Sequence, residues 1–330
     1  MYSFCTYFDC RYLVRGLALY QSLKQHCSPF QLWVLCMDSN CYEVLSELRL
    51  PNVHLIALEE FEKGDERLLE AKKTRSLIEY YFTCSPSLPL YVLNNCPEVN
   101  LITYLDADLF FFADPSQLYN EIAHYSISII GHRFPPNLRD QEIYGRYNVG
   151  FLSFRRDEQG LACLHWWRDR CLEWCYDRAE DGRFADQKYL DVWPTLFPRT
   201  VVLDHKGANL APWNLSNYTV SRKRGEIWVD EQPLIFFHFH GSKSPEEWFD
   251  DPSWAFYQVE PSKVVGRHIY EPYVRTMAAL ARETLPLMQR FPPADELRGK
   301  APTSLSPQSL RPKQSIMSTI RRRMRISRIY

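Results

Sequence analysis

The chain has 330 residues, a formal net charge of −1 and 45% hydrophobic residues. That is enough for one large α/β domain with a substantial core and a small extension. No apolar run reaches the ~20 residues that span a bilayer, and the first nine residues lack the basic region of a signal peptide. Ten scattered cysteines without CxxC spacing predict reduced thiols in a core. We therefore expect a cytoplasmic protein.

Charge is distributed unevenly along the chain. Residues 290–330 contain ten Lys and Arg against two acidic residues, so the remainder carries a net charge of −9. An acidic body argues against a nucleic-acid-binding face. Residues 1–290 are predicted to form one domain, and 291–330 a disordered Pro- and Ser-rich linker with a basic tail. Residues 316–330 combine arginines with apolar residues, which suits peripheral contact with an anionic membrane at its inner face, or a solvated tail.

The first sixty residues predict strands alternating with helices. Aromatic and apolar runs favour strands over 3–8, 31–37 and 53–58, and apolar residues at helical spacing favour helices over 16–26 and 41–48. Such alternation predicts a parallel sheet with right-handed crossovers. Because ligands bind at the carboxyl ends of these strands, we expect residues 6–12 to line the site.

A mostly helical region follows over residues 68–92, with a break near Pro86. Its lysines, Lys72 and Lys73, fit a solvated helix face. Arg75 fits either that face or a contact with a diphosphate.

Residues 101–115 contain two carboxylates inside a long apolar run, Leu-Ile-Thr-Tyr-Leu-Asp-Ala-Asp-Leu-Phe-Phe-Phe-Ala-Asp-Pro. The run predicts a strand buried on both faces, on which Asp106 and Asp108 would point to the same side. Two such carboxylates would repel each other and be costly to bury, and a divalent cation such as Mg²⁺ or Mn²⁺ removes that cost. The alternative is a strand that has ended, with both side chains in solvent at a turn.

The middle of the chain predicts further strands and helices. A helix from Asp114-Pro115 to residue 125, a strand over 126–131, a polar mobile loop over 135–146 and a strand over 147–154 follow in order. Gly150 within the last strand marks either close approach of a ligand or a bulge. The tryptophan-rich helix over 160–176 favours core packing over a sugar-binding platform.

Three more segments contribute candidate site residues. Asp186 and Gln187 begin a short helix, where an acidic residue is either an N-cap or part of a site. A polar loop covers 207–214. Residues 233–241 predict a buried strand end with His238 and His240 on one face, either of which could complete a metal site begun by two aspartates. Lys243 follows as a point charge for a phosphate.

Taken in order, these motifs resemble those of retaining glycosyltransferases of family 8 and their relatives among bacterial cell-surface polysaccharide enzymes. The matching motifs are an aromatic first strand, Asp-x-Asp, Asn-x-Gly, Asp-Gln, Asn-x-x-Pro-x-Asn and His-x-x-Gly with a lysine. The resemblance runs from Met1 to about Trp248. It implies a GT-A fold, with a mostly parallel, Rossmann-like sheet, helices on both faces and a C-terminal extension. It also implies a UDP-sugar donor and Mn²⁺ or Mg²⁺.

The resemblance also implies roles for individual residues. The metal ligands would be Asp106, Asp108 and His238, with His240 as the alternative. Asp186 and Gln187 would be the catalytic pair beside the donor sugar. The donor would be held by Thr6, Asp9, Tyr12, Arg75, Asp106, Asn148, Gly150, Asn209, Trp213, Gly241 and Lys243.

The chain departs from the family at two points. The family's closing motif usually has the form His-Tyr-x-Gly-x-x-Lys-Pro-Trp, whereas Lys243 here comes one residue early. The basic residue that precedes Asp-x-Asp in the family has no clean counterpart.

From the motifs as a set we predict a metal-dependent hexosyltransferase that moves a sugar from a nucleotide sugar to a glycan or lipid-linked acceptor, with retention. A nucleotidyltransferase that makes sugar nucleotides and a non-catalytic scaffold remain alternatives.

Overall fold

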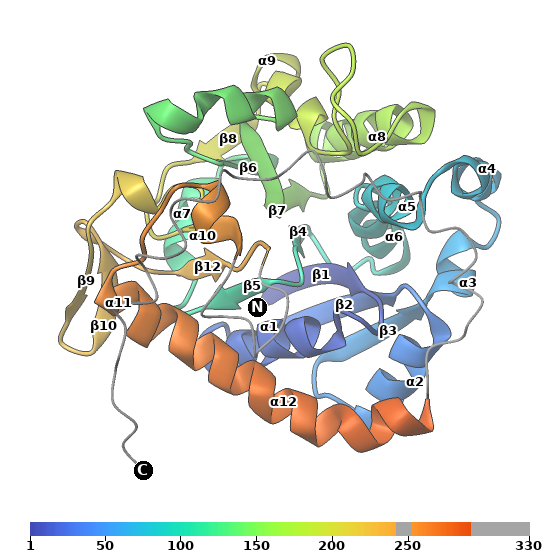
Figure 1. The fold of residues 1–330 in the computed structure, drawn as a ribbon. Helices are drawn as coiled ribbons and strands as arrows, with labels where there is room; N and C mark the ends of the chain where they lie inside the picture. The colour runs from blue at the N-terminus through green and yellow to red at the C-terminus, as the bar shows by residue number, and fades with distance from the viewer. Residues whose placement is uncertain (242–251, 292–330) are drawn as a thin grey trace, which may run out of the picture. The chain divides into compact units, whose positions relative to one another are not determined.

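A computed structural model describes residues 1–241 and 252–291, and Met1–Pro293 form one compact unit. Its centre is a seven-stranded sheet in the order β3-β2-β1-β4-β7-β6-β8 (Figure 1). The bounds of these strands are β1 Tyr2–Phe8, β2 Phe30–Cys36, β3 Val53–Ala57, β4 Leu101–Leu105, β6 Ile127–Gly131, β7 Tyr147–Arg155 and β8 Thr200–Leu203.

The sheet is mostly parallel. Strands β1 to β4 are parallel to one another, and β6 is parallel to β8, but β7 runs antiparallel to both β4 and β6. Apolar periodicity predicts a strand without giving its direction, so the reversal of β7 was not foreseen. It places the start of β7, with Asn148 and Gly150, beside the carboxyl end of β4.

The sheet is buried on both faces, because successive residues of each strand enter different cores. In β2, Leu32 and Val34 pack with α1 (Leu13–His26) in one core, while Trp33 and Leu35 belong to the other. The first core also contains residues of α2 (Ser39–Leu48) and α12 (Glu271–Arg290), and Figure 1 shows α12 lying alongside both helices.

Helices of the middle of the chain cover the second face. Trp167 and Trp193 are fully buried in this core, which agrees with the core packing expected for Trp167. The bounds of the helices on and around this face are α3 Leu58–Glu62, α4 Glu66–Thr74, α5 Leu77–Cys84, α6 Ser87–Asn95, α8 Glu158–Glu173 and α9 Trp193–Leu196, with a 3₁₀ helix η2 at Lys188–Val192.

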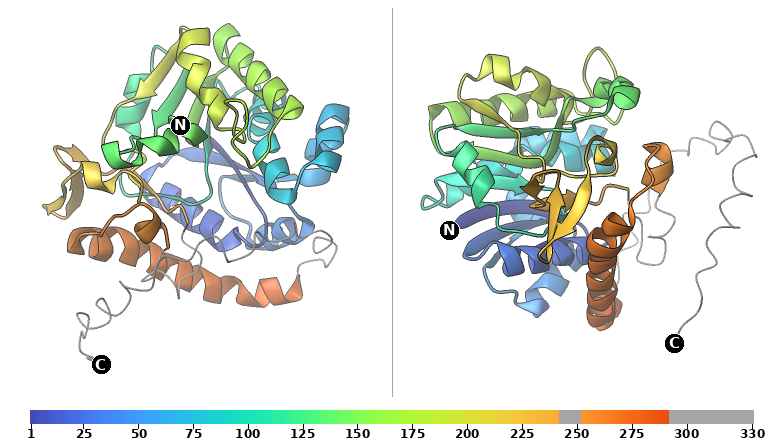
Figure 2. Two further views of the ribbon diagram at one scale, coloured as in Figure 1. Left: turned by 45° about the horizontal axis from the view of Figure 1, so that its top comes forward. Right: turned by 90° about the vertical axis from the view of Figure 1, so that its left-hand side faces the viewer.

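Smaller elements complete the described chain (Figure 2). Strands β9 (Val220–Lys223), β10 (Glu226–Val229) and β11 (Gln232–Pro233) form a separate antiparallel sheet, and β5 (Leu109–Phe111) pairs with β12 (Phe236–His238). The remaining helices are α7 Ser116–Ile122, η1 Pro136–Tyr144, η3 Leu215–Asn217, α10 Pro252–Phe256, α11 Lys263–Val265 and the π-helix η5 Gly266–Tyr270.

Three expectations are corrected here. Residues 136–144 form a 3₁₀ helix rather than a loop. Helix α7 begins one residue later than expected, with Pro115 as N-cap and the Asp114 carboxylate accepting from the Ser116 N–H. Strand 53–58 ends at Ala57, because Leu58 begins α3. The linker and tail predicted over 291–330 lie outside the described residues, apart from Phe291. No helix in the described part of the chain is long and apolar enough to cross a bilayer.

Candidate active site

The Asp-x-Asp segment forms a turn between two strands, not the continuous strand that its apolar run predicts. Strand β4 ends at Leu105 and β5 begins at Leu109. The Leu109 N–H donates to the Asp106 carbonyl at 3.2 Å, and the Asp106 N–H donates to the Gly150 carbonyl at 3.1 Å. Strand alternation is therefore not what brings the two carboxylates together. The turn does so, at the carboxyl end of β4, where ligands bind in sheets of this type.

The pairing of β5 with β12 brings His238 to these carboxylates. His238 lies opposite Leu109, and the Phe239 N–H donates to the Asp108 carbonyl at 3.0 Å. The His238 Nε2 atom is 3.0 Å from Asp108 Oδ1 and 3.7 Å from Asp106 Oδ2. One ligand atom from each of the three residues lies within 4.8 Å of the others, so a single cation could contact all three.

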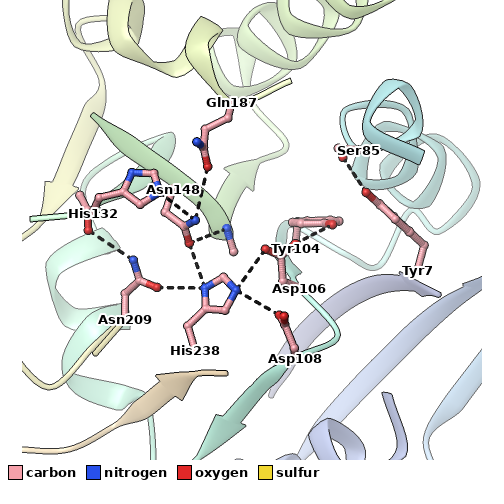
Figure 3. Close-up of polar contacts among 12 residues, drawn as sticks. Tyr7, Ser85, Tyr104, Asp106, Asp108, His132, Asn148, Gln187, Asn209 and His238 are labelled. Atoms are coloured by element: carbon pink, nitrogen blue, oxygen red, sulfur yellow. Dashed lines mark hydrogen bonds and ion pairs between the residues drawn. The ribbon is translucent and has the colours of Figure 1, made fainter. Parts of the chain in front are cut away.

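Two asparagines hold the other side of the His238 ring (Figure 3). Nδ1 lies 3.2 Å from Asn148 Oδ1 and 3.3 Å from Asn209 Oδ1. The Gly150 N–H donates to Asn148 Oδ1, and Asn209 Nδ2 donates to the Gly131 carbonyl. These backbone partners fix which end of each amide is oxygen. Nδ1 must therefore carry the hydrogen, and the Nε2 lone pair of neutral His238 faces the two carboxylates.

Gly150 allows this arrangement because a side chain there would collide with it. A Cβ atom would lie 2.7 Å from Asn148 Oδ1, 2.9 Å from His238 Cε1 and 3.0 Å from His238 Nδ1. The groups that approach Gly150 closely are thus two side chains of the site, whereas the sequence predicted a ligand or a bulge. The adjoining β6–β7 pairing is also irregular, with a shift between Ser128 and Ile130.

The cluster has perturbed ionisation because His238 is buried and the two aspartates are half-buried. Burial raises the pKa of Asp106 to about 6, against the attraction of His238. Burial also disfavours ionised Asp108, but the charge of His238 and its hydrogen bond more than offset this and hold the pKa of Asp108 at about 2. Burial lowers the pKa of His238, and the two carboxylates more than offset it, so its pKa is raised. The carboxylates thus favour a positive charge at this position.

The Asp-Gln pair lines the same cavity as the Asp-Asp-His cluster, and this cavity has a volume of about 960 Å³. Asp186 is 4% exposed, and its burial raises the pKa of its carboxyl group to about 7. Gln187 Nε2 donates to the Tyr144 carbonyl at 3.0 Å, and its Oε1 lies 3.4 Å from Asn148 Nδ2. Asn148 therefore joins Gln187 to His238.

The end of β1 also reaches the cavity. Asp9 and Tyr12 line it, whereas Thr6 is fully buried and is not among the lining residues of the described chain. Asp9 is only 2% exposed, and its carboxylate accepts from the backbone and guanidinium of Arg11 and from Tyr81 Oη at 3.1 Å. The exposed charge at this end of the cavity is consequently the Arg11 guanidinium.

Some of the other predicted donor-binding residues line the cavity, and others do not. Trp213, His240 and Gly241 line the cavity. The Trp213 ring packs edge-on to the rings of His238 and His240, with centroid distances of 5.0 and 5.5 Å. Arg75 is not among the lining residues of the described chain. It lies over the Tyr176 ring at 4.0 Å and donates to two backbone carbonyls of residues 172–173. Lys243 falls outside the described residues.

Sequence reasoning missed several residues of this site. His132 is buried, and its Nε2 atom lies 3.3 Å from Asn148 Nδ2. Burial lowers the pKa of His132 to about 3. Its position directly after a strand, next to Gly131, was the available signal. Tyr7, Ser85 and Tyr104 were missed because aromatic and small residues inside apolar runs look like core.

The sheet order and the placement of the Asp-x-Asp turn define a GT-A fold. A crystal structure of the galactosyltransferase LgtC, in complex with donor and acceptor sugar analogues, superposes with a TM-score of 0.54 at 14% identity. The match covers 86% of this chain and 99% of that chain. At this identity the similarity establishes the fold alone, and it confirms the fold class predicted from the sequence.

Two curated relatives define the family. The chain is 38% identical over 247 residues to the uncharacterised protein YfnF of Bacillus subtilis (strain 168), covering 72% of this chain and 81% of that protein. It is 32% identical over 276 residues to the uncharacterised protein YfnD of the same organism, covering 83% and 88%. The chain belongs to the family of YfnF and YfnD. A scan against protein-family models gives no match.

Proposed function

We propose that the protein is a metal-dependent glycosyltransferase that moves a sugar from a nucleotide-sugar donor, a UDP-sugar, to a glycan or lipid-linked acceptor. The proposal follows from the GT-A fold together with the contents of one cavity. An Asp-Asp-His cluster lies on one wall of this cavity and an Asp-Gln pair on another.

The orientation of His238 is the observation that carries the metal assignment. Asn148 and Asn209 hold hydrogen on Nδ1, so Nε2 points at Asp106 and Asp108 as a lone pair. A lone pair facing two half-buried carboxylates is unfavourable unless a proton or a cation lies between them. Two carboxylates and one imidazole fit Mn²⁺ or Mg²⁺ by ligand chemistry. When bound, such a cation neutralises negative charge that develops on the leaving diphosphate.

The chain's own residues then orient the donor. Asp106, Asp108 and His238 fix the diphosphate end of the cavity, and Asp186 with Gln187 face the sugar end. Gln187 is held by the Tyr144 carbonyl and by Asn148, so its amide is positioned before the donor arrives. We assign Asp186 and Gln187 to stabilisation of positive charge on the reacting sugar carbon. With retention, the acceptor hydroxyl attacks from the leaving-group side, and the departing phosphate takes its proton.

The region after residue 291 gives a separate element of the proposal. Over 316–330 its arginines lie among apolar residues. We assign to this tail a peripheral contact with anionic membrane lipids, which would bring the domain to a lipid-linked acceptor. This element and the catalytic assignment are independent of each other.

A panel of UDP-sugars tests the catalytic assignment. Each donor is incubated with the protein in Mn²⁺ or in EDTA, and the released sugar is followed by proton NMR, which also reports its anomeric configuration. We expect hydrolysis of at least one UDP-sugar in Mn²⁺ only, with retained configuration. Release of diphosphate from a nucleoside triphosphate and a sugar phosphate would instead identify a nucleotidyltransferase. Donor binding without turnover, even with acceptor mixtures, would identify a scaffold.

A further inference from the structure

Three asparagines in the segment after β8 donate hydrogen bonds to three consecutive carbonyl groups at and just after the end of β6. The pairs and their donor-to-acceptor distances are Asn209 to Gly131 at 3.3 Å, Asn214 to His132 at 2.9 Å and Asn217 to Arg133 at 2.6 Å. Asn209 and Asn214 are the two asparagines of the Asn-x-x-Pro-x-Asn motif. The motif therefore fastens the loop that carries Asn209 to the central sheet.

Asn214 is the central residue of this arrangement. It is fully buried, and its Nδ2 donates to the carbonyl of Asn209 at 2.9 Å as well as to that of His132. Its Oδ1 accepts from the Ala211 N–H at 3.0 Å. Both hydrogens of the amide and its oxygen are therefore used. A single side chain thus joins the end of β6 to the backbone of Asn209 itself.

The backbone around Asn209 is held at three consecutive carbonyls. Besides the Asn209 carbonyl, that of Ala208 accepts from the Arg133 guanidinium, and that of Leu210 accepts from the His238 N–H at 2.8 Å. Asn209 is fully buried and has a φ of 56°, in the left-handed region that asparagine tolerates better than most residues. These contacts fix the backbone from which the Asn209 amide projects, and so they fix the direction of that amide.

We propose that Asn214 is a positioning residue for the cation site. It fixes the backbone of Asn209, whose Oδ1 lies 3.3 Å from His238 Nδ1 and accepts its hydrogen (Figure 3). That hydrogen bond directs Nε2 of His238 toward Asp106 and Asp108. The inference rests on the proposed function, in which these three residues contact a divalent cation. Asn214 is not among the cavity-lining residues of the described chain, and it acts through Asn209.

Removing the Asn214 amide should loosen the cation site without dismantling it. The carbonyls of His132 and Asn209 would lose buried donors, which is costly, so the loop would shift until they find other partners. Asn209 would then hold the His238 ring less well. Asn148 Oδ1, which lies 3.2 Å from the same ring nitrogen, would still accept from it. We therefore expect a partial loss of cation affinity.

Binding of Mn²⁺ to the full-length protein tests the proposal without turnover. Free Mn²⁺ is measured by electron paramagnetic resonance, which gives the dissociation constant. Groups that orient a metal ligand typically contribute about 10–100-fold to affinity, so Asn209→Gly, which tolerates the left-handed backbone, should weaken binding by about tenfold or more. Because Asn214 acts one residue further away, we expect Asn214→Ala to weaken binding by about three- to fivefold. Loss of stability alone would leave the dissociation constant of the folded protein unchanged.

A double-mutant cycle shows whether Asn214 acts through Asn209. Asn214→Ala should weaken Mn²⁺ binding in the wild-type background and have little further effect in the Asn209→Gly background. Asn217→Ala is the matched control. Asn217 makes the same kind of bond from the same segment, but it is exposed and holds the Arg133 carbonyl instead of that of Asn209. This control should bind Mn²⁺ like the wild type.

Several results would overturn the proposal. Asn214→Ala that binds Mn²⁺ like a normally binding wild type overturns the positioning role alone, as does a loss of equal size in both backgrounds or in Asn217→Ala. A wild-type protein that binds no Mn²⁺ overturns the positioning role and the cation site together. Should Asn214→Ala not fold, Asn214→Ser takes its place in the same cycle with the same expected direction, because one hydroxyl hydrogen cannot serve both carbonyls.

Discussion

Replacing Gly150 by alanine tests the geometry of the site without removing any functional group. The added Cβ would lie 2.7–3.0 Å from Asn148 Oδ1 and from Cε1 and Nδ1 of His238. Carbon contacts are comfortable at about 3.5 Å and beyond, so these atoms must retreat by roughly half an ångström or more. His238 is buried and bonded on both sides. We therefore expect Gly150→Ala to lower the free energy of unfolding by about 1–3 kcal/mol, the range for overpacking a core.

The same displacement should reach the proposed cation site. His238 would be displaced from its present position beside Asp106 and Asp108, and its partner Asn148 would be displaced as well. Changes to groups that orient a metal ligand typically cost about 10–100-fold in affinity, so we expect Mn²⁺ binding to weaken by about tenfold or more. Urea denaturation gives the stability change, and isothermal titration gives the affinity.

Gly266→Ala provides the matched control for this prediction. A Cβ at Gly266 meets nothing within 4 Å, and the residue lies in a helical segment. That variant should be as stable as the wild type or more stable, since alanine is favoured over glycine in helices by about 0.5–1 kcal/mol. The geometric reasoning is refuted if Gly150→Ala matches the wild type in both stability and Mn²⁺ affinity.

Three further predictions follow from the same contacts. His238→Ala should sharply raise the Mn²⁺ concentration needed for half-maximal activity, while His240→Ala should raise the donor KM at saturating Mn²⁺; the reverse pattern would move the ligand to His240. The wild type should lose stability relative to Asp186→Asn as pH rises, because burial raises the pKa of Asp186 from 3.8 to about 7. Over this pH interval the free energy of unfolding of the wild type should fall relative to that of Asp186→Asn by on the order of a few kcal/mol. A difference between the two proteins that stays constant with pH would exclude this. Deleting residues from 302 onward should leave turnover of water-soluble acceptors unchanged and weaken binding to anionic liposomes, by on the order of 1 kcal/mol for each basic residue removed from the surface; equal liposome binding would rule out the membrane contact.

Much of the fold could be predicted because its signals are local. Strands β1 to β3 and helices α1 and α2 lie within a few residues of their expected positions, since apolar periodicity and short connections specify them. The antiparallel direction of β7 was not predictable in this way, because pairing partners depend on the whole sheet. Helix α12 carries Tyr273, Met277 and Leu280 on its buried side, a helical spacing that was legible in the sequence but not used.

The site was predictable in its residue types and less so in its geometry. Asp106, Asp108 and His238 do meet, but through a turn and a β5–β12 pairing rather than through one strand. An apolar run that crosses a turn looks the same as an unbroken strand. Asp9 was expected to help hold the donor and lines the cavity, where its carboxylate is paired with Arg11 and Tyr81. A partner 72 residues away leaves no signal in a single sequence.

The central claim is that the cavity holds a nucleotide through a divalent cation on Asp106, Asp108 and His238. Titration of UDP into the protein by calorimetry, in Mn²⁺ and then in EDTA, tests this most directly, with Asp108→Asn as the matched variant. Asp108→Asn keeps the side-chain shape while removing the carboxylate closest to His238. The account predicts one UDP site per chain in Mn²⁺, little binding in EDTA, and a large loss of affinity in Asp108→Asn. Equal UDP binding in Mn²⁺ and EDTA, unaffected by Asp108→Asn, would contradict it.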